Sequence, residues 1–194
     1  MTIVVITHLT LDGVMQAPGR ADEDLRGGFE HGGWAKPYGD AILGGIMAEG
    51  MSQGASLLLG RRTYEDFASV WPARKDNPFT DVLNATQKYV VSTTLKEPLP
   101  WVNSTLLRGD AATTVAALKA QAGLNLVVLG SGMLVQSLMR QNLVDQYLLT
   151  IHPLVLGAGR RLFADGGPGA SLRLIDSRTT TTGVVVATYR PAAV

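Results

Sequence analysis

A short run of apolar residues, a glycine and a helix-forming stretch follow one another at residues 57–67 (LLLGRRTYEDF). Gly60 separates the strand pattern from a helix that we expect to start near Arg62 or Thr63. A helix N-terminus offers unpaired N–H groups and the positive end of the helix dipole, and Arg61 and Arg62 add positive charge. The segment therefore predicts a phosphate-binding turn, although a capped helix with solvated arginines would have the same pattern.

A second turn of this kind occurs at residues 126–138 (LVVLGSGMLVQSL). Gly130 and Gly132 allow a ligand to approach the backbone closely, and the following helix can receive a diphosphate. Alone this signal is weak, because the third glycine of the dinucleotide fingerprint is absent.

The two turns together predict more than either does alone. Two strand-to-helix turns at one edge of a sheet can bind the two ends of a dinucleotide, so a nucleotide site becomes the better interpretation. Residues 90–94 (VVSTT) add the hydroxyls of Ser92 and Thr93 at a third strand end, suited to a ribose or its phosphate. A capped loop would explain the same residues.

Other chemistries find little support. The chain has no Cys, which excludes thiol nucleophiles, thiolate zinc sites and iron–sulfur clusters. His8, His31 and His152 lack the short spacings of a metal-binding helix, so we expect no metal. Neither a G-x-S-x-G elbow nor a P-loop motif occurs. Residues 156–163 (LGAGRRLF) contain Gly-x-Gly, but ADGGPG follows and no helix can form there, so we interpret them as a shaped loop.

Composition bounds the remaining possibilities. The 194 residues are 46% hydrophobic, enough to bury the core of one domain spanning 1–194. A net charge of +1 argues against a protein built to bind nucleic acid or a membrane surface. Asp12 interrupts the N-terminal apolar run before it resembles a signal peptide, and no run reaches the length of a membrane span. We expect a cytoplasmic protein.

The elements that must position these turns follow an α/β pattern. Short apolar runs rich in β-branched residues predict buried strands, and a helix starting at Asp110 and ending at Gly123 connects two of them. A second helix is expected over 131–142. The expected strands cover residues 2–9, 56–60, 88–92, 125–130 and 146–155.

The C-terminal residues 171–190 alternate apolar and polar side chains around a Thr-Gly break, which predicts an antiparallel hairpin and hence a mixed sheet. Val184, Val185 and Val186 give both hairpin faces apolar side chains, which a second subunit could cover. Two segments, 13–38 and 71–80, are longer than simple connections and are candidates for binding loops.

Eight segments, quoted in chain order, resemble the dihydrofolate reductase-like superfamily: TLDGVMQ, GGW, LLLGRRTYE, WP, KYVVSTTL, LVVLGSGMLVQSLM, LVDQYLL and HPLVLGAGRRLF. Within it, the chain is most similar to stand-alone proteins related to the reductase domain of the bifunctional riboflavin-biosynthesis deaminase-reductase. The resemblance implies a three-layer α/β fold, with helices on both faces of a mixed, mostly parallel sheet of about eight strands. It also implies NADP(H) as cofactor and a homodimer.

The resemblance assigns roles to matching residues. Those for the cofactor are Met15, Gly60, Arg61, Thr63, Ser92, Thr93, Gly130, Ser131, Gly132, Met133 and Leu134. His8 and Met15 fall where the superfamily lines the nicotinamide, and Asp12 is the acidic residue of its first motif.

Three departures from the family pattern affect the expectations. Relatives often carry Arg where this chain has Thr93, which removes a cation near the 2′-phosphate and predicts modest preference for NADPH over NADH. The riboflavin reductases contact substrate with a Lys at the position of Ile6. Folate reductases place a carboxylate on the first helix, where this chain has Gly44 and Gly45.

Two functional hypotheses remain open. In the first, the protein is a reductase that transfers a hydride to a small heterocyclic or carbonyl or imine substrate, with His8 and Asp12 as candidate catalytic residues. His8 could equally be a bonded strand residue, and Asp12 could cap a turn. The aromatic residues that could line a substrate pocket are Trp34, Tyr64, Phe67 and Trp71, although ordinary anchoring of the loops would explain each of them as well. In the second hypothesis the protein binds a nucleotide without turnover.

Overall fold

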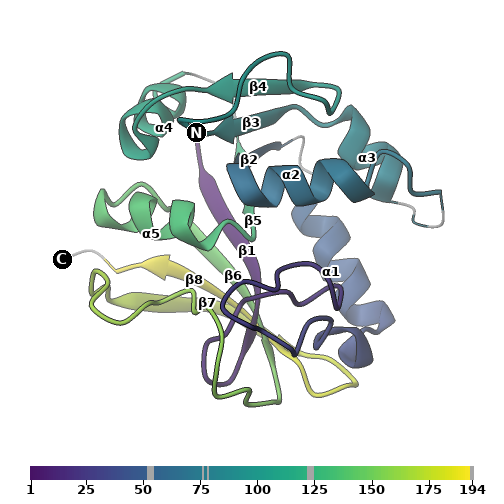
Figure 1. The fold of residues 1–194 in the computed structure, drawn as a ribbon. Helices are drawn as coiled ribbons and strands as arrows, with labels where there is room; N and C mark the ends of the chain where they lie inside the picture. Colours follow the sequence, from purple (N-terminus) through teal and green to yellow (C-terminus); the bar gives the residue numbers. More distant parts are fainter. Residues whose placement is uncertain (52–54, 76, 78, 122–124, 193–194) are drawn as a thin grey trace.

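The computed structural model describes residues 1–51, 55–75, 77, 79–121 and 125–192 (Figure 1). Its centre is an eight-stranded sheet with the strand order β4-β3-β2-β5-β1-β6-β8-β7. The strands are β1 (Ile3–Thr10), β2 (Ser56–Gly60), β3 (Lys88–Val91), β4 (Ser104–Leu107), β5 (Leu126–Leu129), β6 (Gln146–His152), β7 (Leu172–Thr179) and β8 (Val185–Pro191).

The sheet is mixed, as the sequence predicts. Strands β1 to β6 pair in parallel, whereas β8 pairs antiparallel with both β6 and β7. The C-terminal hairpin is therefore confirmed. Because β1, β2, β3, β5 and β6 are parallel, their carboxyl ends meet at one edge of the sheet, where binding sites of open α/β folds form.

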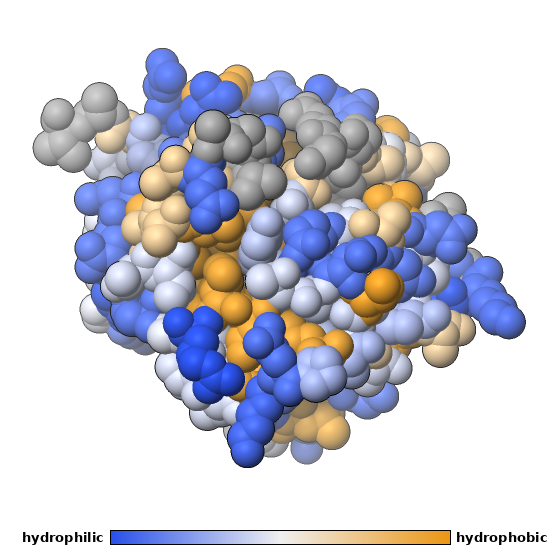
Figure 2. All heavy atoms as spheres, turned by 90° about the horizontal axis from the view of Figure 1, so that it is seen from above, coloured by the Kyte–Doolittle hydropathy of each residue, from blue (hydrophilic) through white to orange (hydrophobic). Residues whose placement is uncertain are grey.

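Helices cover both faces, which confirms the three-layer arrangement. They are α1 (Ala41–Met51), α2 (Arg61–Val70), α3 (Phe79–Ala85), α4 (Ala111–Lys119) and α5 (Gly132–Arg140), with a short 3-10 helix at Lys36–Tyr38. Alternation along β1 divides the core: Ile3 and Val5 pack in the cluster that holds the buried residues of α4 and α5, and Ile6 packs with those of α2 and α3. On the face shown in Figure 2, hydrophilic residues cover most of the surface and apolar residues form smaller groups between them.

Local capping explains one helix that was predicted and one that was not. Asp110 caps α4 by accepting a hydrogen bond from the N–H of Thr113. The predicted end of this helix at Gly123 lies outside the described residues, and α4 ends at Lys119. Helix α1 forms in spite of Gly44 and Gly45, because Asp40 bonds the N–H of Leu43 at its start and because Leu43 and Ile46 are buried.

The remaining differences from the predicted elements concern short ones. Strand β4 and helix α3 were not predicted, and Phe79 and Thr80 of the expected loop 71–80 belong to α3. Among the helices of the described segments, none has the length and apolar character that a membrane crossing requires.

Candidate functional site

Two adjoining cavities open at the carboxyl edge of the sheet. The small cavity, of about 470 Å³, lies over the ends of β2, β3 and β5, and the large cavity, of about 750 Å³, lies between the end of β1 and helix α2. Thr63, Ser131 and Gly132 line both cavities, so the two form one continuous groove. Their volumes are in the range of small-molecule and cofactor sites.

The starts of α2 and α5 meet at the small cavity and are bonded to each other. The N–H of Gly60 donates to Oγ of Ser131 across 3.0 Å, and the N–H of Ser131 donates to Oγ1 of Thr63 across 3.1 Å. Ser131 adopts φ 52°, an unfavourable value for a residue with a side chain, and this conformation lets it reach both neighbours. The two predicted turns are thus joined by hydrogen bonds at one place on the sheet edge.

The N-cap residues of α2 and α5 are Gly60 and Ser131, and neither forms a side-chain hydrogen bond to the first turn of its helix. Helix α4, at the rim of the same cavity, instead has the carboxylate of Asp110 bonded to Thr113. The first-turn N–H groups of α2 and α5 are therefore available to an anion, and the helix dipoles favour one there.

Three arginines line the small cavity: Arg26, Arg61 and Arg62. Nη1 of Arg61 forms an exposed ion pair with Glu65 one turn further along α2, at 3.0 Å. Arg26 comes from the long loop after β1 and is paired with Asp24. With two helix starts and these cations, the small cavity has the chemistry of a diphosphate site.

The hydroxyls at the end of β3 divide into two roles. Oγ of Ser92 accepts hydrogen bonds from the N–H groups of Thr94 and Leu95 and is buried, so it caps the following turn. Thr93 lines the cavity and is exposed. Of the two, Thr93 is the residue that can contact a ligand.

Met15 lies at the junction of the two cavities, against Gly132. A Cβ at position 132 would stand 2.6 Å from Sδ of Met15, so a larger residue there would displace the end of the Met15 side chain. Met15 and Gly130 line the large cavity, and Met133 and Leu134 line the small one. All residues predicted to bind cofactor thus line one cavity or the other.

The large cavity has an apolar end. Phe67 and Trp71 of the predicted substrate residues lie there, together with Ile6, Met47, Leu83 and Leu129. Along α2 the lining runs from Arg62 and Thr63 past Glu65 and Asp66 to Phe67, about 6 Å beyond Thr63 at 1.5 Å per residue, and then to Trp71 at the end of the helix. A ligand that spans the groove would therefore place its charged part at the small cavity and a ring at the apolar end.

His8 also lines the large cavity, and its Nδ1 is engaged on the buried side. Nδ1 lies 2.9 Å from Nε2 of His152 and 2.9 Å from Oγ1 of Thr150. Burial lowers the pKa of His8 to about 4, with a smaller contribution from His152, so His8 is neutral near pH 7. A neutral histidine can donate or accept a hydrogen bond but is no source of a strong acid.

Asp12 is placed differently from the catalytic prediction. Within the described residues, neither cavity has Asp12 in its lining. Its carboxylate accepts hydrogen bonds from the hydroxyl of Thr10 and from the N–H groups of Leu156 and Gly157. The bond from Thr10 is the main cause of the lowered pKa of Asp12. This geometry favours the turn-capping role, and a catalytic role stays a prediction.

Two of the four predicted substrate aromatics do not reach the groove. Trp34 is buried beneath the long loop, where its Nε1 donates to the carbonyl of Gln16 across 2.7 Å. Tyr64 is 1% exposed and its hydroxyl accepts the N–H of Trp101. Both predictions are corrected: these side chains anchor the structure around the groove.

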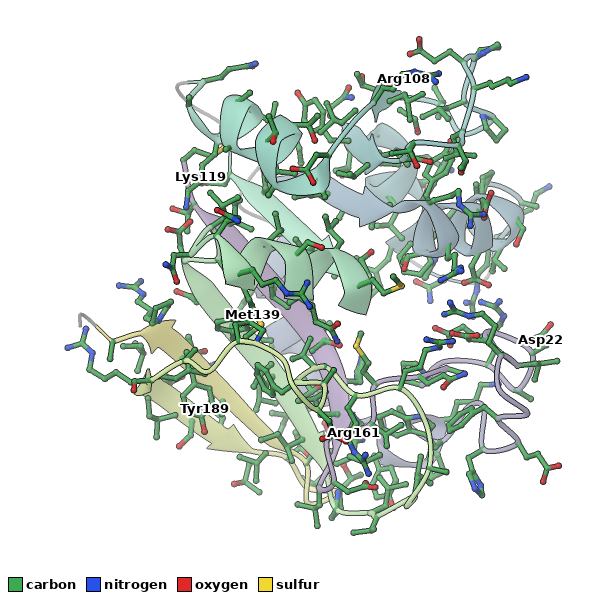
Figure 3. The ribbon with its side chains drawn as sticks, turned by 60° about the vertical axis from the view of Figure 1, so that its left-hand side comes forward. Asp22, Arg108, Lys119, Met139, Arg161 and Tyr189 are labelled. Atoms are coloured by element: carbon green, nitrogen blue, oxygen red, sulfur yellow. The ribbon has the colours of Figure 1, made fainter. Side chains whose placement is uncertain are left out.

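Sequence reasoning missed polar residues that loops bring to the large cavity, among them Gln16, Arg160 and Arg161. A bridge between Val14 and Arg161 joins the two loops, and Arg161 lies beside the end of β1 in Figure 3. The LGAGRRLF loop is therefore part of the site. Its paired arginines after Gly-x-Gly were the available signal. No cluster of metal-ligating side chains occurs within the described part of the chain.

The long loop is also tied to α2. Nη2 of Arg20 donates to Oδ1 of Asp66 across 2.5 Å, and Glu23 accepts the N–H groups of Gly19 and Arg20. Asp22, beside this pair, points outward in Figure 3. These contacts hold residues 16–26 over one wall of the large cavity.

Comparison with known proteins gives matches along most of the chain. The sequence profile of the family described as RibD C-terminal domain matches residues 1–186. Uncharacterized protein YyaP of Bacillus subtilis (strain 168) is 29% identical over 147 residues, which cover 72% of this chain and 75% of YyaP.

Solved structures show the same fold. A putative riboflavin biosynthesis protein from Shewanella sp. PV-4 superposes with a TM-score of 0.69 at 22% identity and covers 100% of both chains. Dihydrofolate reductase from Enterococcus faecalis, complexed with NADP(H), superposes with a TM-score of 0.61 at 12% identity, covering 99% of this chain and 97% of the reductase. The dihydrofolate reductase-like fold expected from the sequence is confirmed.

Proposed function

The chain belongs to the RibD C-terminal domain family, and from this premise we propose that it is an NADPH-dependent reductase of a small heterocyclic or carbonyl or imine substrate. The observation that carries the proposal is the pair of helix starts at Gly60 and Ser131, bonded to each other in a groove that continues into an apolar cavity. We place the activity in the cytoplasm, which suits a chain without Cys.

The residues present fit a nicotinamide dinucleotide. The diphosphate would be held by the first-turn N–H groups of α2 and α5, with Arg61 and Arg62 supplying charge. Thr93, at the rim of the small cavity, would face the adenosine ribose. Met15 would separate the phosphate-binding part of the groove from the large cavity.

The bound cofactor would supply a hydride, and the chain's own residues do the rest. Phe67 and Trp71 hold a flat ring at the apolar end and exclude water from it. His8, neutral and fixed on its buried side, can hydrogen-bond a substrate atom that gains electron density. A neutral imidazole in this role stabilises the developing charge on the substrate through a hydrogen bond, without transferring a proton.

The residues at the apolar end of the large cavity indicate which kind of substrate the enzyme would bind. Ile6 occupies the position at which riboflavin reductases contact substrate with Lys, and it packs with Leu83 and Leu129 in this wall. These residues suit an uncharged ring, whereas Arg160 and Arg161 in the same cavity suit a charged group of the substrate. The enzyme would thus be similar in chemistry to 5-amino-6-(5-phosphoribosylamino)uracil reductases but would lack their lysine contact to the substrate.

The test measures the binding of NADPH first and its oxidation by candidate substrates second. NADPH should raise the melting temperature, because a ligand that binds only the folded state stabilises it by mass action. Loss of reduced nicotinamide absorbance is then followed over a panel of pterins, pyrimidines, quinones and imines. No thermal shift and no calorimetric heat at millimolar NADPH would refute the proposal. Binding without oxidation by any member of the panel would favour the alternative, a nucleotide-binding protein without turnover.

A further inference from the structure

His8 of the large cavity and the buried His152 belong to adjacent parallel strands. In the register of β1 and β6, His8 is opposite Thr150 and Thr10 is opposite His152. The two rings are 5.2 Å apart, with Nδ1 of His8 and Nε2 of His152 separated by 2.9 Å. His152 is completely buried, and the rings of Trp34 and Tyr38 pack against it edge to face at 5.2 and 5.4 Å.

The short distance between these nitrogens fixes how many protons lie between them. Burial lowers the pKa of His152 to about 4 as well, so near neutral pH each ring carries one proton. Two facing N–H groups would clash at 2.9 Å, and two facing lone pairs would repel. One nitrogen therefore donates and the other accepts, and the choice sets the tautomer of both rings.

Two arrangements satisfy this condition. In the first, His152 donates from Nε2 to a bare Nδ1 of His8, which leaves the proton of His8 on its own Nε2. In the second, His8 donates from Nδ1, and His152 carries its proton on its own Nδ1. Oγ1 of Thr150 fits the two arrangements differently. In the second it accepts from Nδ1 of His8 while its hydroxyl donates to the carbonyl of Thr7 across 3.1 Å, and in the first the hydroxyl turns from Thr7 to donate to Nδ1 of His8.

The surroundings of His152 favour the first arrangement. Its Nδ1 is buried and has no hydrogen-bonding partner within the described residues. In the second arrangement this atom would be an N–H without an acceptor, whereas in the first it is a bare ring nitrogen. Among backbone groups, orphaned buried N–H donors are rarer than under-satisfied acceptors, and the same preference applied here selects the first.

We propose that His152 is a positioning residue that holds His8 as the Nε2–H tautomer, so that His8 presents an N–H donor to the large cavity. The role in catalysis rests on the proposed reductase function; the tautomer does not. Among the described residues, none forms a hydrogen bond with Nε2 of His8, which leaves this atom for a ligand. The acceptor on the substrate would be the carbonyl oxygen or ring nitrogen that gains charge on reduction.

The tautomer can be read directly in the cofactor-free protein. Long-range ¹H–¹⁵N correlation spectra distinguish a protonated from a bare ring nitrogen, and His8→Gln identifies the signals of His8 by their loss. We expect Nε2 of His8 to be protonated and Nδ1 to be bare in the wild-type protein near neutral pH. The reverse assignment would overturn the proposal.

Three variants separate positioning from packing. His152→Phe keeps a ring against Trp34 and Tyr38 but removes the donor, so His8 should become a mixture of tautomers. His152→Gln places an amide N–H at a similar reach and should restore the Nε2–H form. Thr150→Val, which removes the other polar neighbour of Nδ1, is the matched control and should leave the tautomer unchanged.

An unchanged tautomer in His152→Phe would overturn the positioning role. If that variant does not fold, the wild-type assignment and the Gln variant still decide. With an active substrate in hand, His152→Phe should lower kcat while the Kd for NADPH stays unchanged, and His152→Gln should recover part of the loss. Failure of NADPH to bind would refute the reductase function without touching the tautomer result.

Discussion

The carboxylate of Asp12 accepts a hydrogen bond from the N–H of Gly157 across 2.8 Å, which joins the turn after β1 to the loop after β6. The guanidinium of Arg161 reinforces the junction, because its Nε donates to the carbonyl of Asp12 across 2.8 Å. The loop that carries Arg160 and Arg161 is thus held against the mouth of the large cavity by a residue outside it. The role of Asp12 that this geometry favours is therefore to hold the loop after β6 in place beside the large cavity.

Substitution separates this role from a catalytic one. Asn has one acceptor oxygen, so Asp12→Asn cannot keep all three bonds from Thr10, Leu156 and Gly157. We expect the free energy of unfolding to fall by about 1 kcal/mol, with NADPH affinity nearly unchanged. Urea unfolding and calorimetry test this, with exposed Asp22→Asn as the control. Turnover lowered about 10²-fold at unchanged stability would instead make Asp12 catalytic.

The sequence predicted the backbone of the site better than its side chains. The turns at Gly60 and Gly130 follow from local patterns, since glycine after a buried strand and before a helix specifies the geometry within a few residues. Arg160 reaches the site through the pairing of Val14 with Arg161, which is a contact between distant segments. Local patterns contain no information on such a contact.

The same reasoning explains the fold elements that were missed. Strand β4 has four residues with no fully buried position, so its apolar signal is too short to identify. Helix α1 depends on the burial of Leu43 and Ile46 against Val184 and Val186 of the C-terminal segment, which overrides the low helix propensity of its glycines. In both cases tertiary contacts decide what local propensity cannot.

Removing Arg61 should weaken cofactor binding. If its guanidinium contacts a phosphate at the start of α2, Arg61→Ala should cost about 1.5 to 3 kcal/mol of NADPH binding free energy, the value of a charge-assisted hydrogen bond. The loss should shrink as salt is raised, because the side chain is partly exposed. Calorimetric titration measures it, and Arg140→Ala, at the other end of α5, is the control. Equal Kd values for the two variants would show that Arg61 carries only surface charge.

Replacing Thr93 by the arginine that relatives often carry should increase the preference for NADPH over NADH. Thr93 is exposed and lines the small cavity, so an arginine there can reach a 2′-phosphate. Thr93→Arg should tighten NADPH and leave NADH unchanged, since only NADPH carries that phosphate. Comparing the two Kd values at low and high salt checks the result. Equal tightening of both cofactors would place position 93 away from the 2′-phosphate.

We propose that the chain forms a homodimer through the outer face of the C-terminal hairpin. Val184 and Val186 are buried against α1, but Leu174, Ile175 and Val185 remain 51%, 42% and 37% exposed. A second copy would cover this apolar edge. Light scattering at micromolar concentration should give twice 20.6 kDa, and Ile175→Lys should give 20.6 kDa. Val102→Lys, between β3 and β4 at the opposite edge of the sheet, should stay dimeric; a wild-type mass of 20.6 kDa would contradict the proposal.

Acid should destabilise the protein through the histidine pair before Asp12 and Asp24 titrate. Burial lowers the pKa values of His8 and His152 from 6.5 to about 4, so between these values the unfolded chain binds protons that the folded chain does not. The free energy of unfolding should therefore fall as the pH drops from 6.5 towards 4, by at most about 1.4 kcal/mol per pH unit for each histidine. Below pH 4 the pair causes no further loss.

Asp12 and Asp24, whose pKa values are lowered from 3.8, lose their contribution only at still lower pH, which separates the two effects. Urea unfolding across the interval should show a shallower pH dependence for His152→Phe than for the wild type, because one depressed pKa is gone and the other loses its neighbour. His31→Gln, which changes an exposed histidine, is the matched control and should keep the wild-type slope. If His152→Phe keeps that slope as well, the pair is not the source of the acid sensitivity, because a buried neutral histidine that must be charged on unfolding has to leave this signature.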